Sequence, residues 1–544
     1  MPNYDKTLGD QLDRTAARYP DHEAIIYNEQ RISYKELQQR VNKLAKGLLA
    51  LGVQKGDKIA LWLSNRPEFI YAKFAIAKIG AVMVPLNTRY KRHEIEYILG
   101  HSDSTALITM ANFLGINFLE LIKEFLTDTL DRGAGRLHSH KLPLLRNVIC
   151  IADERYNGML RLADIMESKS SEIEDEALKK RQSSVAADNI VNLPYTAGTT
   201  GFPKGVMLTH YSILRHMHNN ADLLGINDRD RFIVYLPLFH VFGCIVNVVM
   251  AILRGSCLIL QEHFDAGESL RLIEKERATV IMGVPTMYTM QLGHKDFNKF
   301  DLSSLRTGEI GASTIPVDLV KEIITKMGVK GLMSGYGMTE ASSTISGTAK
   351  GDPIEIIATT VGQPFPDTEM KIVNPKTGKT VPSGMEGEIL VRGFHVMKGY
   401  YKEPEATRKA IDEAGWLHTG DLGVMLENGY FKFVGRLKEI YIAGGFNVYP
   451  SEVENFLYSY PKIRQAYVIG IPDRIMGEVG MAFVQLKEGV SCTQEDIIDY
   501  CRGKIANFKI PKFIEFVSEF PMTSSGKIQK FKLREMANKR FGSV

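Results

Sequence analysis

The sequence has few cysteines, little net charge and no long uninterrupted apolar segment. Its five cysteines form no C-x-x-C pair, so neither a zinc knuckle nor a disulfide framework is indicated. The 67 basic and 63 acidic side chains leave a net charge of +4 and are scattered along 544 residues, which argues against nucleic-acid binding. With 44% hydrophobic and 24% charged residues, the composition is that of an ordinary globular protein with a large core.

Membrane and export signals are also missing. The most apolar stretch, residues 241–260, is interrupted by Asn247 and Arg254 before it reaches the roughly 20 apolar residues that a membrane span needs. We interpret it as a buried helix and strand. The N-terminal segment has no apolar signal region, and the last three residues are not the peroxisomal S-K-L, so we predict a cytoplasmic location.

Local patterns indicate alternating helices and strands. Ser33 and Glu36 form a capping box ahead of an apolar face at helical spacing, which predicts one amphipathic helix. Short apolar runs at residues 58–63 and 81–86 flank a second helical stretch at residues 68–79. This alternation predicts an α/β fold with βαβ-layered, largely parallel sheets.

Two changes in composition divide the chain. Residues 166–188 are polar and charged, and we expect them at the surface. Residues 435–445 place charge and glycine between two apolar regions, which suggests a domain junction. The remainder mixes strands, as at residues 466–471, with helices, as at residues 493–503, and can fold as a small α+β domain.

Residues 195–205, YTAGTTGFPKG, have the composition of a phosphate-binding loop. Glycines let backbone N–H groups approach phosphate oxygens, threonines donate further hydrogen bonds, and the lysine adds positive charge. The pattern does not fit a Walker A loop, and a flexible surface turn is the alternative for this segment alone. The candidate ligand-binding residues are Thr196, Gly198, Thr199, Thr200, Gly201 and Lys204.

Residues 336–340, YGMTE, also suit a nucleotide. Tyr336 could lie against a purine, Thr339 could donate to a phosphate, and Glu340 could hold the Mg²⁺ that accompanies a polyphosphate, because hard cations prefer oxygen ligands. A structural turn is the alternative.

Three further positions are weak signals when taken one at a time. Asp421 in a T-G-D segment and Arg436 after Gly435 offer a carboxylate and a guanidinium suited to ribose hydroxyls. Lys527 ends the glycine and hydroxyl turn PMTSSGK, where an exposed lysine is ordinarily only solvated surface.

Taken together, these motifs resemble the adenylate-forming superfamily, which comprises acyl-CoA synthetases, peptide-synthetase adenylation domains and luciferases. The resemblance extends from about Leu8 to Leu533. The motifs that carry it are YTAGTTGFPKG (195–205), LPLFH (236–240), GYGMTE (335–340), TGD (419–421), GRLKE (435–439) and GKIQK (526–530).

The resemblance implies an N-terminal AMP-binding domain at residues 1–434, a hinge at residues 435–440 and a mobile C-terminal domain at residues 441–544. It also implies two half-reactions. In the first, a carboxylate attacks the α-phosphorus of ATP and gives acyl-AMP and pyrophosphate. In the second, a thiol takes the acyl group.

The resemblance also implies a role for each matching residue. Lys527 would bridge the carboxylate and the α-phosphate, which is electrostatic catalysis. Lys438 matches the hinge position, and His240 resembles the family's aromatic gate beside the acyl pocket. For ATP, the resemblance implies that Thr196, Thr199, Thr200 and Lys204 contact the β- and γ-phosphates, that Thr339 contacts the α-phosphate and that Glu340 binds Mg²⁺. It implies that Asp421 and Arg436 contact the ribose and that Gly311, Ala312 and Tyr336 contact the adenine; Gly335 and Gly337 belong to the same motif as Tyr336. Gly444 and Gly445 would contact the pantetheine of coenzyme A.

One position departs from the family pattern. The second residue of the phosphate loop is usually serine, and here it is Ala197. If that serine contacts phosphate, its loss removes roughly 0.5 to 1.5 kcal/mol of binding. We therefore expect an effect on ATP affinity and not on the chemistry.

Several activities share these motifs. Peptide-synthetase adenylation domains typically carry F-D where this chain has Phe239 and His240, so a free amino acid is a poor candidate. Because only 17 residues follow Lys527, we expect no carrier domain here and favour coenzyme A as acceptor. A luciferase-like oxygenase would share almost every motif but is far rarer. A silent scaffold is disfavoured because the Glu340 and Lys527 positions are filled.

The acid is harder to predict. Apolar residues around the expected pocket favour a medium- or long-chain fatty acid, with an aryl or alicyclic acid as the alternative. These residues are Phe239, Val241, Phe242, Val246, Val284 and Met338. We thus expect ATP, Mg²⁺, coenzyme A and a small-molecule carboxylic acid as ligands; a homodimer is compatible with the sequence.

Overall fold

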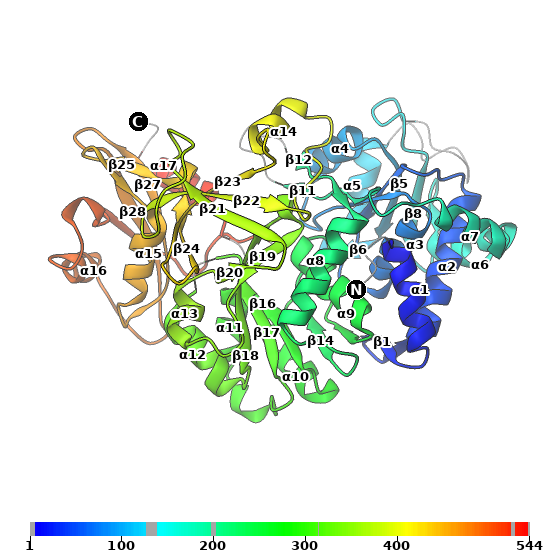
Figure 1. The fold of residues 1–544 in the computed structure, drawn as a ribbon, viewed down its shortest axis with the longest axis horizontal. Helices are drawn as coiled ribbons and strands as arrows, with labels where there is room; N and C mark the ends of the chain where they lie inside the picture. Colours follow the sequence, from blue (N-terminus) through cyan, green and yellow to red (C-terminus); the bar gives the residue numbers. More distant parts are fainter. Residues whose placement is uncertain (1–5, 127–138, 197–202, 314, 524–527, 542–544) are drawn as a thin grey trace.

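Two large sheets covered by helices form most of the molecule. The computed structural model describes residues 6–126, 139–196, 203–313, 315–523 and 528–541. Figure 1 shows the N-terminal helices in blue at one end of the molecule and the C-terminal elements in orange and red at the other. Within the described residues, no helix is long and apolar enough to cross a lipid bilayer.

The largest sheet in the described part of the chain has nine strands, and its centre is parallel. Antiparallel strands close both of its edges. In spatial order the strands are β2 (Gln30–Ser33), β1 (Glu23–Tyr27), β15 (Cys257–Leu260), β14 (Arg231–Val234), β16 (Val280–Gly283), β17 (Thr307–Gly311), β18 (Gly331–Met338), β19 (Ser343–Gly347) and β20 (Gln363–Pro364).

The second large sheet is parallel except at the edge formed by β13. Its strands read as nearly continuous apolar runs because helices cover both faces. In spatial order they are β13 (Leu208–Thr209), β10 (Ile190–Asn192), β4 (Val82–Pro85), β3 (Lys58–Trp62), β5 (Ser104–Met110), β8 (Asn147–Ile151) and β9 (Leu160–Arg161). The predicted α/β class with layered, largely parallel sheets is confirmed.

The helices follow the alternation that the sequence predicts. Helix α2 begins with the Ser33 and Glu36 capping box, in which both reciprocal hydrogen bonds are present. The helices of this part of the chain are α1 (Leu8–Arg18), α2 (Tyr34–Ala50), α3 (Pro67–Lys78), α4 (Arg92–His101), α5 (Phe118–Phe125), α6 (Leu162–Glu167), α7 (Asp175–Ser183), α8 (His210–Leu223), α9 (Val248–Arg254), α10 (Ala266–Glu276), α11 (Pro285–Leu292), α12 (Val317–Lys326), α13 (Ile354–Thr359) and α14 (Pro404–Ala410), with short 3-10 turns η1 (Lys169–Glu172) and η3 (Phe297–Lys299).

The apolar stretch at residues 241–260 is buried, as the sequence predicts. It forms the π-helix η2 (Phe242–Asn247), then α9 and β15, and its apolar side chains are at most 8% exposed. Asn247, which interrupts the stretch, donates its side-chain amide to the Phe242 carbonyl at 2.9 Å. The hydrogen bond satisfies the amide nitrogen of Asn247, while its buried Oδ1 has no hydrogen-bond partner among the described residues.

Two smaller sheets follow in the C-terminal part of the chain, and two-stranded hairpins form from β6 (Asn112–Phe113) with β7 (Ile116–Asn117) and from β11 (Tyr195–Thr196) with β12 (Lys204–Gly205). An antiparallel sheet contains β21 (Thr368–Val373), β22 (Glu386–Gly393), β23 (Leu417–Met425) and β24 (Phe431–Arg436). The 3-10 turn η5 (Leu437–Glu439) leads from it to a last sheet with β26 (Phe446–Val448), β25 (Tyr441–Ala443), β28 (Gly477–Leu486), β27 (Ile463–Asp473) and β29 (Phe513–Phe516). Around this sheet lie α15 (Pro450–Tyr458), α16 (Gln494–Cys501), η6 (Asn507–Lys509) and α17 (Lys530–Phe541).

The buried apolar residues separate along the chain. One large cluster runs from Leu8 to Phe431 and joins the two large sheets with part of the antiparallel sheet. From Tyr441 onward, buried residues form clusters of their own around β27 and β28. The exact domain limits at residues 434 and 441 stay a prediction.

Candidate active site

The predicted phosphate loop is the connection of a two-stranded hairpin. Strand β11 (Tyr195–Thr196) pairs with β12 (Lys204–Gly205), with Thr196 opposite Lys204. The Lys204 ammonium lies 5.2 Å from the centre of the Tyr400 ring, a cation–π arrangement that holds it beside the loop. Ala197, Gly198, Thr199, Thr200 and Gly201 lie outside the described residues, so their predicted contacts remain predictions.

Glu340 lies beside this hairpin. Its Oε1 accepts a hydrogen bond from the Tyr400 hydroxyl at 2.9 Å, and the Thr196 hydroxyl lies 3.4 Å from the same oxygen. Burial, and then the charge of Glu340, raise the pKa of Tyr400 far above its ordinary value, so Tyr400 remains a donor. The Met397 backbone amide also donates to the Glu340 carbonyl at 2.8 Å. The carboxylate is held in place by two hydroxyls, and its oxygens are of the type that Mg²⁺ prefers.

A second group of polar side chains lies at the carboxyl end of β18, in the strand that leads to Glu340. The Tyr336 hydroxyl donates to Asp421 Oδ2 at 2.8 Å, and Arg436 Nε donates to Asp421 Oδ1 at 3.1 Å. Asp421 is 6% exposed, and burial raises its pKa although Arg436 opposes the shift. Strands β18, β23 and β24 therefore bring Tyr336, Asp421 and Arg436 together, as their shared nucleotide assignment requires.

The end of β18 has no space for side chains at its glycines. A Cβ at Gly335 would lie 2.3 Å from Glu309 Oε1, and one at Gly337 would lie 1.9 Å from the Ser343 carbonyl oxygen. A Cβ at Gly311, in the neighbouring strand β17, would lie 2.5 Å from the Gly335 carbonyl oxygen. Ala312, the next residue, has a φ of +72°, a strained value for a residue with a side chain. These glycines allow the backbone itself to form the surface.

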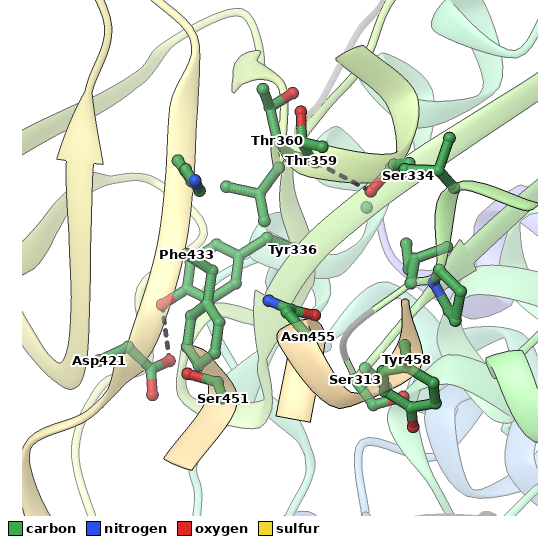
Figure 2. A pocket seen from close by; sticks show the side chains of 18 of the residues that line it. Ser313, Ser334, Tyr336, Thr359, Thr360, Asp421, Phe433, Ser451, Asn455 and Tyr458 are labelled. Carbon is green, nitrogen blue, oxygen red and sulfur yellow. Dashed lines mark hydrogen bonds between the residues drawn. The ribbon is translucent and has the colours of Figure 1, made fainter. Parts of the chain in front are cut away.

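Tyr336, Asp421 and Arg436 border a cavity of about 460 Å³ (Figure 2). Figure 2 shows Tyr336 pointing to Asp421, with Asn455 and Tyr458 of helix α15 facing across the opening. Ala312, Gly335 and Gly337 also line this cavity. It is thus built from both the nine-stranded sheet and the C-terminal part of the chain, and its volume is of the size that small-molecule sites have.

His240 lies two residues before η2 and lines a second cavity together with Gly335. Its Nδ1 accepts from the Phe242 amide at 3.2 Å, and its carbonyl accepts from the Gly243 and Cys244 amides. A Cβ at Gly243 would lie 2.2 Å from the Pro237 carbonyl oxygen, so the tight turn into η2 requires glycine. Short π-helical segments of this kind often occur at functional sites.

A smaller cavity of about 50 Å³ adjoins His240. Three of the six residues predicted for the acyl pocket line it, namely Val241, Phe242 and Met338, and Thr339 reaches it from η4 (Thr339–Ala341); that this cavity holds the acid stays a prediction. The other three expected residues, Phe239, Val246 and Val284, are not among its lining residues. The residue that sequence reasoning missed is Glu309, a carboxylate that reaches the same cavity from β17.

The predicted hinge residue, Lys438, is exposed in η5. Its neighbour Glu439 accepts from the Lys530 ammonium at 2.9 Å, and Lys530 also pairs with Glu454 of α15 at 2.8 Å. Lys530 is the last residue of the GKIQK motif, so the C-terminal motif contacts the hinge segment directly. Lys527, the predicted catalytic lysine, lies outside the described residues.

Gly444 and Gly445 form the turn between β25 and β26. Their φ values are +58° and +89°, which favour glycine, and the Gly444 amide donates to the Met476 carbonyl at 2.8 Å. Both glycines are exposed. Their predicted contact with pantetheine stays a prediction.

Several residues near the predicted ligand contacts gave no signal in the sequence. Tyr400 lies in a segment, GYY, that resembles ordinary core, and only its approach to Glu340 in space identifies it. Asn455 and Tyr458 belong to an amphipathic helix far along the chain. His101 also gave no signal; its Nδ1 and the hydroxyl of Tyr195, the first residue of the predicted phosphate loop, form a hydrogen bond at 2.8 Å that anchors the hairpin to α4.

The chain is similar to known proteins over nearly its whole length. The family model of the AMP-binding enzymes matches residues 12–401, and that of the AMP-binding enzyme C-terminal domain matches residues 452–527. YngI of Bacillus subtilis (strain 168) is 43% identical over 537 residues, 98% of each chain. The medium-chain acyl-CoA ligase ACSF2, mitochondrial, of Danio rerio is 38% identical and covers 99% of this chain and 90% of its own. Among solved structures, the anthranilate CoA ligase AuaEII in complex with anthranoyl-AMP matches with a TM-score of 0.86 and 29% identity over 98% of both chains.

Proposed function

The chain belongs to the AMP-binding enzymes, within the acyl-CoA synthetases and ligases, and from this we propose that it activates a medium- or long-chain fatty acid with ATP and transfers the acyl group to coenzyme A. The family resemblance that six sequence motifs indicated is confirmed, as is the fold, a large α/β domain followed by a small mixed domain. ACSF2, a medium-chain acyl-CoA ligase, supports the proposed acid.

One observation carries the proposal. The carboxyl end of β18 bears Tyr336, which contacts Asp421, and continues directly into Thr339 and Glu340, which faces Thr196 and Tyr400. In sheets of this type, ligands bind outside the carboxyl ends of parallel strands. A nucleoside at Asp421 and a polyphosphate at Glu340 would therefore bind as parts of one molecule.

The residues of the chain divide the first half-reaction among them. Asp421 and Arg436 would bind the ribose, Gly311, Ala312 and Tyr336 the adenine, and Thr339 the α-phosphate. The acid's carboxylate oxygen attacks the α-phosphorus, the bond between the α-phosphorus and the α,β-bridging oxygen breaks, and pyrophosphate leaves with that oxygen.

The hairpin and the C-terminal lysine supply the charge for this step. Thr196 and Lys204 would bind the β- and γ-phosphates, and Lys527 would stabilise negative charge where the carboxylate meets the α-phosphate. The oxygens around Glu340 fit Mg²⁺, which when bound neutralises the charge on the departing pyrophosphate.

In the second half-reaction, the thiol sulfur of coenzyme A attacks the acyl carbonyl carbon, loses its proton, and AMP leaves. We propose that the C-terminal domain, residues 441–544, rotates about Lys438 between the two steps and brings Gly444 and Gly445 to the pantetheine. A cytoplasmic location and a small-molecule acid as partner are part of the same proposal.

An aryl or alicyclic acid is the second candidate. It is supported by the similarity to AuaEII, whose structure holds anthranoyl-AMP. Pyrophosphate release from ATP, measured with aliphatic and aryl acids in the presence of coenzyme A, decides between the two. If no acid releases pyrophosphate, the proposed function is wrong.

Lys527→Ala tests the assignment of the two half-reactions. The variant should lose adenylation and still convert supplied acyl-AMP and coenzyme A to the thioester, because Lys527 is assigned to the first step alone. Both rates are measured in separate assays on the same preparation. Equal loss of the two steps would refute the role.

Lys438→Pro tests the rotation. Proline fixes φ near −65°, so the variant should release pyrophosphate normally while thioester formation stalls. Unchanged overall turnover would contradict a hinge at this residue. The matched control is Lys438→Ala, which removes the same side chain and leaves φ free. A proline at Lys432 would not serve, because that residue lies within strand β24.

A further inference from the structure

A buried carboxylate with one unpaired oxygen lines the cavity beside His240. Glu309 is 2% exposed and lies on the central strand β17. Its Oε1 accepts from the Thr344 hydroxyl at 2.7 Å. Its Oε2 is buried and has no hydrogen-bond partner among the described residues.

Two other buried glutamates show which partners a structural carboxylate has in this protein. Glu276 pairs with both Arg31 and Arg231. Glu454 accepts from the Val468 amide and pairs with Lys530. Buried carboxylates are ordinarily paired in this way, because desolvation disfavours an isolated one. Within the described residues, Glu309 has no ion pair, so its environment lacks the partner that its counterparts have.

The position of Glu309 suggests where the missing partner comes from. Its cavity lies between Thr339, assigned to the α-phosphate, and the apolar residues Phe242 and Met338, assigned to the acid. A side chain at Gly335 would collide with the Glu309 carboxylate, so the glycine keeps this part of the strand open. At about 50 Å³ the cavity exceeds the roughly 10 to 15 Å³ that one water molecule requires.

We propose that Glu309 is a specificity-determining residue that accepts a hydrogen bond from an O–H or N–H group on the acyl part of the acid. The inference rests on the proposed function and narrows it: the preferred acid carries a hydroxyl or amino substituent close to its carboxylate and is not a plain alkanoic acid. A substrate with only C–H groups at this position leaves the buried Oε2 without a hydrogen-bond partner.

Both kinds of donor suit the group. Burial raises the pKa of Glu309 to about 7, so the ionised carboxylate is available near neutral pH. A hydroxyl would supply a neutral hydrogen bond, and an ammonium would add an opposite charge. The absence of an F-D motif argued against an amino-bearing acid, but β17 brings a carboxylate to the cavity that His240 lines. Sites built to bind a substrate donor discriminate strongly against analogues that lack it.

The test compares acids that differ only in the donor. Octanoate is paired with 3-hydroxyoctanoate and 3-aminooctanoate, and benzoate with its hydroxy and amino derivatives. The kcat/KM for ATP-dependent pyrophosphate release is measured for each. For the wild-type protein, at least one substituted acid should exceed its parent by about 10-fold or more.

Three variants identify the residue responsible. Glu309→Leu should reduce that ratio to about threefold or less, because the acceptor is gone and the pocket becomes apolar. Glu309→Gln keeps the shape of the side chain and loses its charge. The kcat/KM advantage over the parent acid should therefore fall more for the amino-substituted acids than for the hydroxy-substituted acids. Glu276→Gln removes a buried carboxylate far from the cavity and should leave the ratio unchanged within about twofold.

The outcomes separate this inference from the proposed function. If every substituted acid and its parent are used equally, or if Glu309→Leu keeps the full wild-type ratio, the inference is wrong while pyrophosphate release still supports the synthetase. If no acid releases pyrophosphate, both are wrong. Thermal unfolding checks that the variants fold. If Glu309→Leu does not fold, the question is decided by whether Glu309→Gln lowers the kcat/KM ratio of substituted acid to parent acid.

Discussion

Replacing Tyr400 by phenylalanine tests whether Glu340 is positioned as a metal ligand. Two hydroxyls donate hydrogen bonds to Glu340 Oε1, and the bond from Tyr400, at 2.9 Å, is shorter than the bond from Thr196, at 3.4 Å. Tyr400→Phe removes only that hydroxyl and leaves the ring that lies under Lys204. Glu340 then keeps one weak side-chain contact and is free to turn away from the hairpin.

The expected magnitude follows from this geometry. Residues that orient a metal ligand typically contribute about 10- to 100-fold to metal affinity or activity, which corresponds to roughly 1.4 to 2.7 kcal/mol. We therefore expect Tyr400→Phe to raise the Mg²⁺ concentration that gives half-maximal pyrophosphate release by about 10-fold or more. The midpoint is measured by titrating Mg²⁺ at constant ATP and acid.

The adjacent tyrosine provides the control. The Tyr401 hydroxyl donates to Asp103 at 2.8 Å, which is also a hydrogen bond to a carboxylate, but this carboxylate pairs with Lys402 and is not assigned to any ligand. Tyr401→Phe should leave the Mg²⁺ midpoint within about twofold of wild type. Equal midpoints for Tyr400→Phe and the wild-type protein would refute the positioning role, and equal shifts in both variants would indicate a general effect on stability.

Two further predictions concern stability. Because burial raises the pKa of Glu309 from 4.5 to about 7, the folded protein holds a proton between these pH values that the unfolded chain has released, and its stability falls as pH rises through that window. In Glu309→Gln, the fall in unfolding free energy between about pH 5 and pH 7.5 should be smaller by on the order of 2 kcal/mol; an unchanged pH profile in denaturant titrations would contradict the shift. Gly337→Ala should lower the melting temperature, because its Cβ would overlap the Ser343 backbone, with a loss of about 1 to 3 kcal/mol or more. Gly100→Ala in helix α4 meets only an ordinary contact with Leu142 and should not destabilise; similar melting temperatures for the two variants would refute the steric argument.

The elements that could be predicted from the sequence are those that local contacts specify. Helix α2 was identified from its capping box and apolar face, both of which lie within the helix. The order of the strands could not be predicted from the sequence, because strands that lie far apart in the chain pair with each other. Strands β1 and β15, for example, are neighbours although more than half of the N-terminal domain separates them in sequence. Periodicity shows which face of a strand is buried but does not identify its neighbour.

The site divides in the same way. Tyr336, Glu340 and Asp421 stand in compact motifs whose residue types suggest their chemistry. In the structure, Tyr336 and Glu340 lie at the carboxyl end of β18, and Asp421 reaches Tyr336 from β23. Glu309 and Tyr400 are single residues in segments that resemble an ordinary strand and turn. Their importance depends on groups that reach them from other strands, and local sequence does not contain that information.

The π-helical turn η2 after His240 holds one residue more than an α-helical turn would. Each residue of an α-helix advances the chain by about 100° around the axis. Deleting one residue from η2 would restore regular α-helical spacing, and it would also rotate His240 by about that angle relative to α9, away from the cavity that it lines. The surplus residue thus acts as a spacer that sets the direction of the His240 side chain, and its removal would redirect that side chain without changing which residue types lie around the cavity.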